Sequence, residues 1–170
     1  MASTESIRLA KLINEKVGVL KTMCQGIDEK TASRAPEGRW SPKEIISHLC
    51  GKEGEGFIVT VQAYLDHDTP RIDIEPENPF FTDRRSRMTL AELLAAFEQQ
   101  YKIMADRTLS LTEEQLARKA HIPLLKDSPM GEYPTLAIWI QAMVKDHIDC
   151  HVAHMRELLR GRPPHNAYFW

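Results

Sequence analysis

Three of the seven histidines in this 170-residue chain lie close together near its C-terminal end. His147, His151 and His154 stand at i, i+4 and i+7, a spacing that places all three on one face of a helix. Apolar residues continue this face on both sides, so the histidines replace hydrophobic residues that would point into a helical core. Burying an unpartnered imidazole is costly, and an i, i+4 pair offers two nitrogens to one ion. The pattern predicts a metal site; the alternative is a set of hydrogen-bonded core histidines.

A second helix with a clear start signal carries another histidine on its inward side. Ser41 is the expected N-cap, Pro42 takes the first helical position, and Glu44 completes a capping box. The predicted helix covers residues 41–66. His48 lies one to two turns inside its start, on the side that faces the core.

The third ligand of a metal site is expected from an inward polar residue on another helix. His147 and His154 are two turns apart, about 10 Å along the helix axis, so the three histidines of the last helix cannot share one ion. His48 is the best remaining candidate. The predicted ligands are therefore His48, His147 and His151, and a pair of His151 with His154 stays open as an alternative.

Several polar residues near these histidines are candidates for supporting roles. They are Glu53, Glu55, Asp146, Asp149, Cys150 and His154. The acidic side chains are interpreted as bases or as groups that orient an imidazole. Their alternative is a solvated surface position, where most Asp and Glu side chains lie. Cys150 is an alternative ligand or an oxidisable thiol, although a small buried hydrophobic residue is its more common role.

Three glycines follow His48 within the predicted second helix. Gly51, Gly54 and Gly56 are unfavourable in a helix interior, by about 1 kcal/mol each relative to alanine. They indicate either close helix packing or a kink, or room for a ligand beside His48.

Composition limits the classes of function. The net charge of −2 argues against a general nucleic-acid binder, and the short cluster Arg84, Arg85 and Arg87 is expected to be a solvated loop. Three cysteines without metal or redox spacing, behind a polar N-terminus, predict a cytoplasmic protein. No apolar run approaches the length of a membrane span.

The periodicity of the chain predicts an all-α, four-helix bundle with a long crossover connection. The expected helices cover residues 3–27, 41–66, 89–108 and 135–160, with a short helix at 112–118. Residues 67–88 form the irregular crossover, in which Phe80 and Phe81 either pin the chain to the core or border a pocket. We expect one domain over residues 1–161, followed by an aromatic tail at 162–170.

Two segments resemble a known family. The sequence WSPKEIISHL at residues 40–49 is similar to the start of the second helix in the DinB-like (DinB/YfiT) superfamily of metalloenzymes, and HIDCHVAHMREL at 147–158 is similar to its last helix. The resemblance covers nearly the whole chain. It implies a four-helix bundle with a long crossover, and a nickel or zinc ion held by His48, His147 and His151. The family often has glutamine where this chain has His154.

The resemblance also implies a class of reaction. Characterised relatives are mostly thiol-dependent transferases or isomerases, so it implies an S-transferase that adds a low-molecular-weight thiol to an electrophile. A metal-dependent hydrolase and a non-catalytic, metal-binding stress-response protein are the alternatives. The expected partners are a small-molecule substrate and, from the aromatic tail and the habit of the family, a second copy in a homodimer. Neither nucleic acid nor a membrane is expected as a partner.

Overall fold

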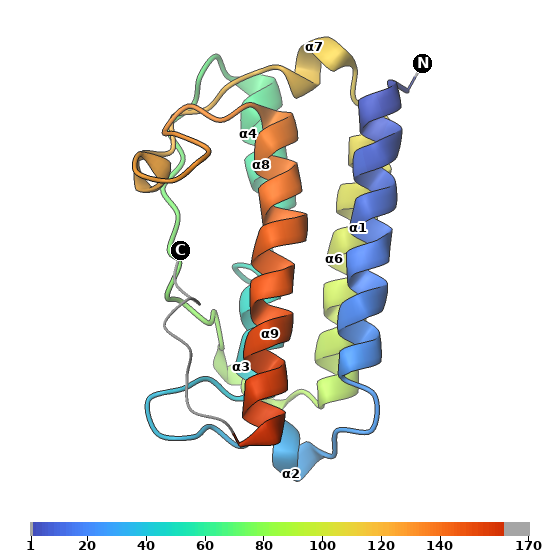
Figure 1. Ribbon diagram of the computed structural model, residues 1–170, viewed down its shortest axis with the longest axis vertical. Helices are drawn as coiled ribbons and strands as arrows, with labels where there is room; N and C mark the ends of the chain where they lie inside the picture. Colours follow the sequence, from blue (N-terminus) through green and yellow to red (C-terminus); the bar gives the residue numbers. More distant parts are fainter. Residues whose placement is uncertain (1, 162–170) are drawn as a thin grey trace.

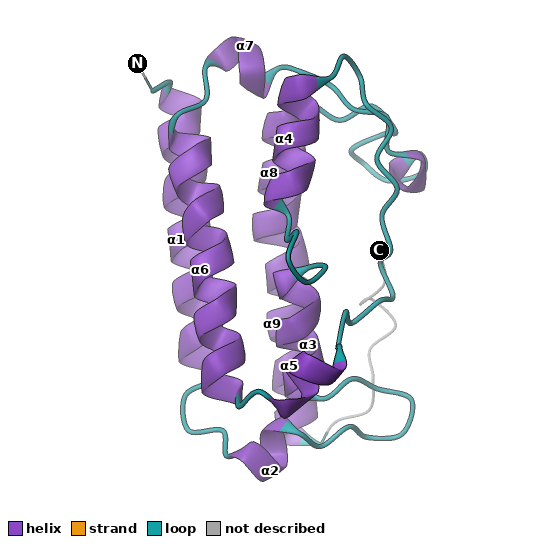
Figure 2. Cartoon of the chain, turned by 180° about the vertical axis from the view of Figure 1, so that it is seen from behind, coloured by secondary structure: helices purple, strands orange, loops and turns teal. Residues whose placement is uncertain are grey.

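The computed structural model describes residues 2–161, and its regular elements in that range are helices (Figures 1 and 2). These are α1 (Thr4–Met23), α2 (Glu29–Ala32), α3 (Pro42–Cys50), α4 (Ile58–Asp66), α5 (Asp83–Arg87), α6 (Leu90–Leu109), α7 (Glu113–Leu116), α8 (Leu136–Gln141) and α9 (His147–Arg160). A 3-10 turn at Pro123–Leu125 and a π-helical segment at Ala142–Asp146 complete them. The predicted tail at 162–170 lies outside the described residues.

Four long helical rods make up the bundle: α1, α3 with α4, α6, and α8 with α9. In Figure 1, α1 runs downward, α3 and α4 return upward, and α6 also runs upward, before α8 and α9 descend. The second and third rods are therefore parallel, and the segment between α4 and α6 has to travel back along the bundle to connect them. This is the predicted four-helix bundle with a long crossover, and the prediction is confirmed.

Two predicted helix starts have the expected caps. The Ser41 hydroxyl accepts a hydrogen bond from the backbone N–H of Glu44 at 3.2 Å, and the Glu44 carboxylate accepts from the N–H of Ser41 at 2.7 Å. Thr89 and Glu92 form the same reciprocal pair at the start of α6. Both boxes satisfy backbone donors that a helix start leaves unpaired.

The predicted continuous helix over residues 41–66 is wrong. It is broken between α3 and α4, and Gly51, Gly54 and Gly56 in this break have φ values of 70°, 82° and 60°. Glycine adopts this left-handed region without the steric cost that a Cβ brings. The glycines therefore end α3 and allow the chain to turn before α4 begins.

Other boundaries also differ from the prediction. The first helix ends at Met23, and a separate α2 follows Gly26, whose φ is 79°. The crossover holds the short helix α5 instead of being irregular throughout. Arg85 in α5 is only 7% exposed, so the expectation of a solvated arginine cluster is wrong for this residue. Phe80 borders a pocket while Phe81 packs against the core, so each of the two predicted roles is taken by one of them.

The last rod is continuous but changes its winding. Between α8 and α9 the backbone N–H of His147 bonds to the carbonyl of Ala142, five residues earlier, as in a π-helix. This wider turn stands directly before His147. It accommodates one extra residue, so it sets how the histidine face of α9 is rotated relative to α8.

The core fills the space between the four rods. Its fully buried side chains include Leu9, Ile13, Leu20, Ile45, Leu49, Leu93, Phe97, Val144, Ile148 and Met155. Burying each such side chain contributes about 1.5–3 kcal/mol, which stabilises the bundle around the polar residues of α3 and α9. Among the described helices, none combines the length and apolar character that crossing a membrane requires.

Candidate metal centre

The three predicted ligands converge in the interior of the bundle. The Nε2 atom of His147 lies 2.8 Å from Nε2 of His48 and 3.1 Å from Nε2 of His151. The candidate ligand atoms of the three residues all lie within 4.8 Å of one another. Their side chains come from α3 and α9 and are 4–7% exposed. The fold thus joins residues that are about one hundred positions apart in the chain.

This geometry fits a shared divalent ion. Two nitrogens bound to one ion at about 2.0–2.1 Å lie about 2.9–3.4 Å apart for angles between octahedral and tetrahedral values. The two closest Nε2 separations are near this range. Without an ion, Nε2 of His147 faces two other nitrogens but holds only one proton or one lone pair. An ion satisfies all three lone pairs together, so the donor set suits a metal better than hydrogen bonding alone.

Burial keeps the imidazoles in the form that binds a metal. Desolvation, with a smaller contribution from the nearby His48, lowers the pKa of His147 to about 3. Burial also lowers the pKa of His151 well below its usual value, and lowers that of His48 despite its hydrogen bond to Asn78. Neutral imidazoles carry the free lone pair that a metal requires, so near neutral pH the cluster is ready for an ion without releasing protons.

The crossover fixes the orientation of His48. Its Nδ1–H donates to the backbone carbonyl of Asn78 at 2.7 Å. Because a carbonyl only accepts, the proton of the neutral ring stays on Nδ1 and the lone pair on Nε2 faces the other histidines. Sequence reasoning missed Asn78, and no signal in the sequence identifies it, since every residue carries a backbone carbonyl.

An aromatic ring covers the cluster from another side. The ring of Trp40 lies 4.9 Å from that of His48 and stacks at 6.0 Å, with a 10° interplanar angle, on that of His151. Trp40 directly precedes the N-cap of α3, so the capping box also fixes the backbone position from which the Trp40 side chain extends. Sequence reasoning did not assign Trp40 to the site; its place one residue before the cap was the only available signal.

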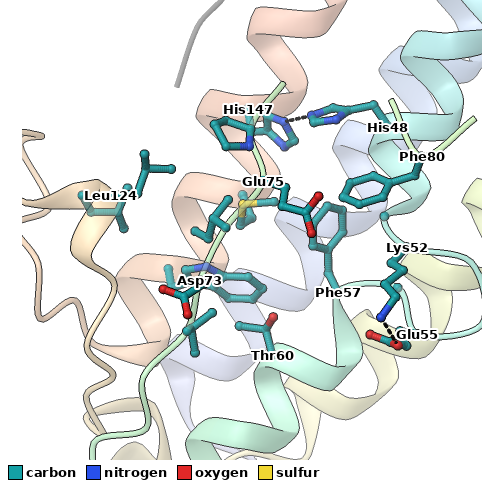
Figure 3. A pocket seen from close by; sticks show the side chains of 18 residues that line it. His48, Lys52, Glu55, Phe57, Thr60, Asp73, Glu75, Phe80, Leu124 and His147 are labelled. Carbon is teal, nitrogen blue, oxygen red and sulfur yellow. Dashed lines mark hydrogen bonds and ion pairs between the residues drawn. The ribbon is translucent and has the colours of Figure 1, made fainter. Parts of the chain in front are cut away.

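A pocket of about 280 Å³ opens beside two of the three histidines. Figure 3 shows His48 and His147 at one end, with Thr60 and the Lys52–Glu55 pair toward the other. The remaining walls are mostly apolar and include Phe57, Ile72, Ile74, Phe80, Leu124, Leu125, Trp139 and Met143. Trp139 and Met143 come from α8 and the π-helical segment, and Gly51 and Gly56 from the helix break. The two irregular parts of the rods therefore shape this pocket.

The predicted acidic residues have different surroundings. Glu55 lines the pocket and forms an ion pair with Lys52 at 2.6 Å. Glu53 instead accepts hydrogen bonds from the Thr82 hydroxyl and from Arg84 of the crossover. These contacts tie the helix break to α5 and direct the Glu53 carboxylate toward α5.

The residues around the histidines of α9 also have other neighbours. Asp146 is exposed, and Asp149 pairs with Lys16 of α1 at 2.6 Å. Cys150 is half-buried, and desolvation raises the pKa of its thiol. The ring of His154 is buried 6.2 Å from that of His151, and desolvation lowers its pKa to about 4. His154 therefore extends the buried histidine face without joining the group of three.

The chain belongs to the class of all-α bundles with a long crossover, and it has a buried cluster of three histidines beside a pocket. Neither a scan against protein-family models nor a search of curated proteins finds a match. A search of solved structures finds YfiT from Bacillus subtilis, described as a probable metal-dependent hydrolase with an unusual four-helix bundle topology. The two chains are 20% identical, and the match has a TM-score of 0.73 over 96% of this chain and 92% of YfiT. The chain therefore has the DinB/YfiT-like fold that the resemblance predicted.

Proposed function

We propose that this protein is a divalent-metal-dependent enzyme that acts on a small molecule bound in the pocket beside His48 and His147. The observation that carries the proposal is the convergence of three buried Nε2 atoms, of which those of His48 and His147 belong to residues that line the pocket. A buried cluster used only for structure would not need an adjoining cavity. Here the cavity gives a substrate direct access to the face of the cluster.

The histidines and the pocket walls would have different roles. His48, His147 and His151 would hold the ion as three neutral ligands, which leaves positions open for other groups. The chemistry that a divalent ion supplies in such a site is the activation of water or of a thiol as a nucleophile near neutral pH. The apolar walls of the pocket would bind the body of the electrophile and exclude bulk water. Nickel or zinc is the proposed ion, because imidazole nitrogen suits both.

The charge of the pocket favours water over an anionic thiol as the nucleophile. Its lining contains three carboxylates, of Glu55, Asp73 and Glu75, and one cation, Lys52. Lys52 already pairs with Glu55, and Asp73 pairs with Arg71. Because Lys52 and Arg71 each pair with one of the three carboxylates, the group keeps a net charge of −1, and a carboxylate-bearing thiol such as glutathione would meet this negative charge. The lining therefore favours hydrolysis, the activity for which YfiT is described as probable, with a substrate that has no negative charge of its own.

A thiol S-transferase is the second candidate. Three neutral nitrogen ligands accept a thiolate as readily as a water, and the apolar walls suit a hydrophobic electrophile. A third candidate, a metal-binding stress-response protein without catalysis, would leave the pocket unused. The three are separated by incubating the metal-loaded protein with neutral esters and amides, and with an electrophile plus bacillithiol, mycothiol or glutathione.

Metal analysis tests the assignment of the ligands. The protein is purified without a histidine tag, and its bound nickel and zinc are measured by mass spectrometry. We expect about one ion per chain in the wild type and a large loss in His48→Ala, His147→Ala and His151→Ala. His154→Ala is the matched control from the same helix face and should retain its metal. Full metal in His48→Ala or His147→Ala, together with loss in His154→Ala, would contradict the assignment.

We further propose that the protein is a cytoplasmic homodimer that does not bind nucleic acid. The net charge of −2 and the cysteine pattern support the location and the lack of nucleic-acid binding. The aromatic residues of the chain end are the reason to expect a partner. Sedimentation that shows only monomer at micromolar concentration, with and without metal, would exclude the dimer.

A further inference from the structure

The crossover contains a buried cation that donates hydrogen bonds to backbone oxygens and to a hydroxyl group. Arg85 of α5 is 7% exposed, and its Nη1 donates to the backbone oxygens of Ser47 at 3.0 Å and Gly51 at 2.7 Å. It also donates to the hydroxyl of Ser47 and to the carbonyl of Phe80. The last carbonyls of a helix are unpaired and carry partial negative charge, so the C-terminal end of α3 compensates this guanidinium.

Arg85 thereby joins α3 to a tight turn of the crossover at residues 78–80. The Phe80 carbonyl that accepts from Arg85 also accepts from the Ser47 hydroxyl at 3.0 Å. The N–H of Phe80 donates to the side-chain oxygen of Asn78 at 2.7 Å. Phe80 has a φ of 48°, an unfavourable conformation for a residue with a Cβ. Such a conformation persists only where surrounding contacts fix it, and here Arg85 and Ser47 supply them.

The same turn presents the carbonyl that orients His48. The Asn78 carbonyl accepts from Nδ1 of His48, and the Phe80 ring stacks on the His48 ring at 6.2 Å with a 15° interplanar angle. The Asn78 side chain also donates to Glu75, a residue of the pocket lining. One turn therefore connects the buried arginine, the imidazole of α3 and the pocket.

We propose that Arg85 is a positioning residue of the metal centre. It holds the 78–80 turn against the end of α3, so that the Asn78 carbonyl keeps the His48 proton on Nδ1 and leaves Nε2 as the ligand atom. This role of Arg85 rests on the proposed metal site, and it also applies to the protein without metal. In the metal-free protein, His48 exists as the Nδ1–H tautomer because of Arg85.

The tautomer of His48 distinguishes positioning from a general structural role. Long-range ¹⁵N NMR on histidine-labelled, metal-free protein reports which ring nitrogen of His48 carries the proton. We expect the Nδ1–H form in the wild type and a mixture of both tautomers in Arg85→Gln. Zinc affinity, measured by competition with a chromogenic chelator, should fall about 10–100-fold, as for other residues that orient a metal-binding histidine.

Arg84→Gln is the matched control. Arg84 is the neighbour of Arg85 in α5, loses the same charge, and has a 72% exposed side chain that pairs with Glu53. It should leave the His48 tautomer unchanged and zinc affinity within about threefold of the wild type, because it does not contact the 78–80 turn. If Arg85→Gln does not fold, Asn78→Ala takes its place. Asn78→Ala removes the side-chain hydrogen bonds to Glu75 and Phe80, which hold the backbone carbonyl of residue 78 in place. This variant should also give mixed His48 tautomers and weaker zinc binding.

Failure of the Arg85 proposal and failure of the proposed metal site give different results. A folded Arg85→Gln or Asn78→Ala protein with wild-type tautomer and wild-type zinc affinity would overturn the proposal, even if its stability were lower. A wild type that binds no divalent metal would remove the proposed function. The tautomer measurement would then still decide whether Arg85 positions His48.

Discussion

Acidification should destabilise the metal-free protein because its histidines are buried in the neutral form. The unfolded chain takes up a proton at each histidine near pH 6.5, whereas burial lowers the pKa of folded His147 to about 3. Between these values the unfolded state binds more protons, so the free energy of unfolding falls as pH falls. From pH 7.5 to pH 5, His147 alone accounts for a loss of about 2 kcal/mol. His151, whose pKa is also strongly lowered, adds in the same direction. A loss of this size is a large part of the 5–15 kcal/mol of a typical domain.

Urea unfolding of chelator-treated protein, followed by circular dichroism at several pH values, measures this loss. The window from pH 7.5 to 5 lies above the range in which most carboxylates titrate, so it isolates the histidines. His147→Gln should reduce the dependence by up to about 1.4 kcal/mol per pH unit below pH 6.5. His67→Gln, at an exposed position, changes the histidine count without touching the cluster and is the control. Equal pH dependence in the wild type and in His147→Gln would refute the reasoning.

Two further predictions concern the helix break and the aromatic cover. Gly51→Ala should lower the free energy of unfolding by about 2 kcal/mol, because its φ is 70° and an added Cβ would lie 3.3 Å from the backbone of Gly56. Gly54→Ala, with φ 82° and open space around it, should cost about 1 kcal/mol, and equal losses in urea unfolding would contradict the role of the backbone contact. Binding of nickel should quench tryptophan fluorescence through Trp40, whose ring lies 4.9 Å from that of His48, more than binding of diamagnetic zinc does. Trp40→Phe should lose most of this quenching while chelator competition still shows nickel binding, and unchanged quenching in this variant would exclude Trp40 as the reporter.

The sequence by itself determined the features that depend on local spacing. His147 and His151 share a helix face because they are one turn apart, and the two capping boxes fix the starts of α3 and α6. His48 followed from the same reasoning, since its distance from the Ser41 cap places it on the inward side of α3. The all-α class and the long crossover follow from helical periodicity and from the prolines between the second and third rods.

Only the tertiary structure decided the features that depend on what lies across the bundle. The Asn78 carbonyl and the Trp40 ring reach His48 because the crossover and the loop before α3 fold over it, and a backbone carbonyl leaves no mark in a sequence. Arginine is by type a surface residue, yet Arg85 is buried, and the unpaired carbonyls at the end of α3 compensate its burial. The three glycines after His48 indicated close packing, a kink or room for a ligand, and only the structure shows that they form a helix break in which Gly56 lies against the Gln100 side chain. Local spacing identified the residues that can bind a metal, and long-range contacts determined their orientation and the pocket beside them.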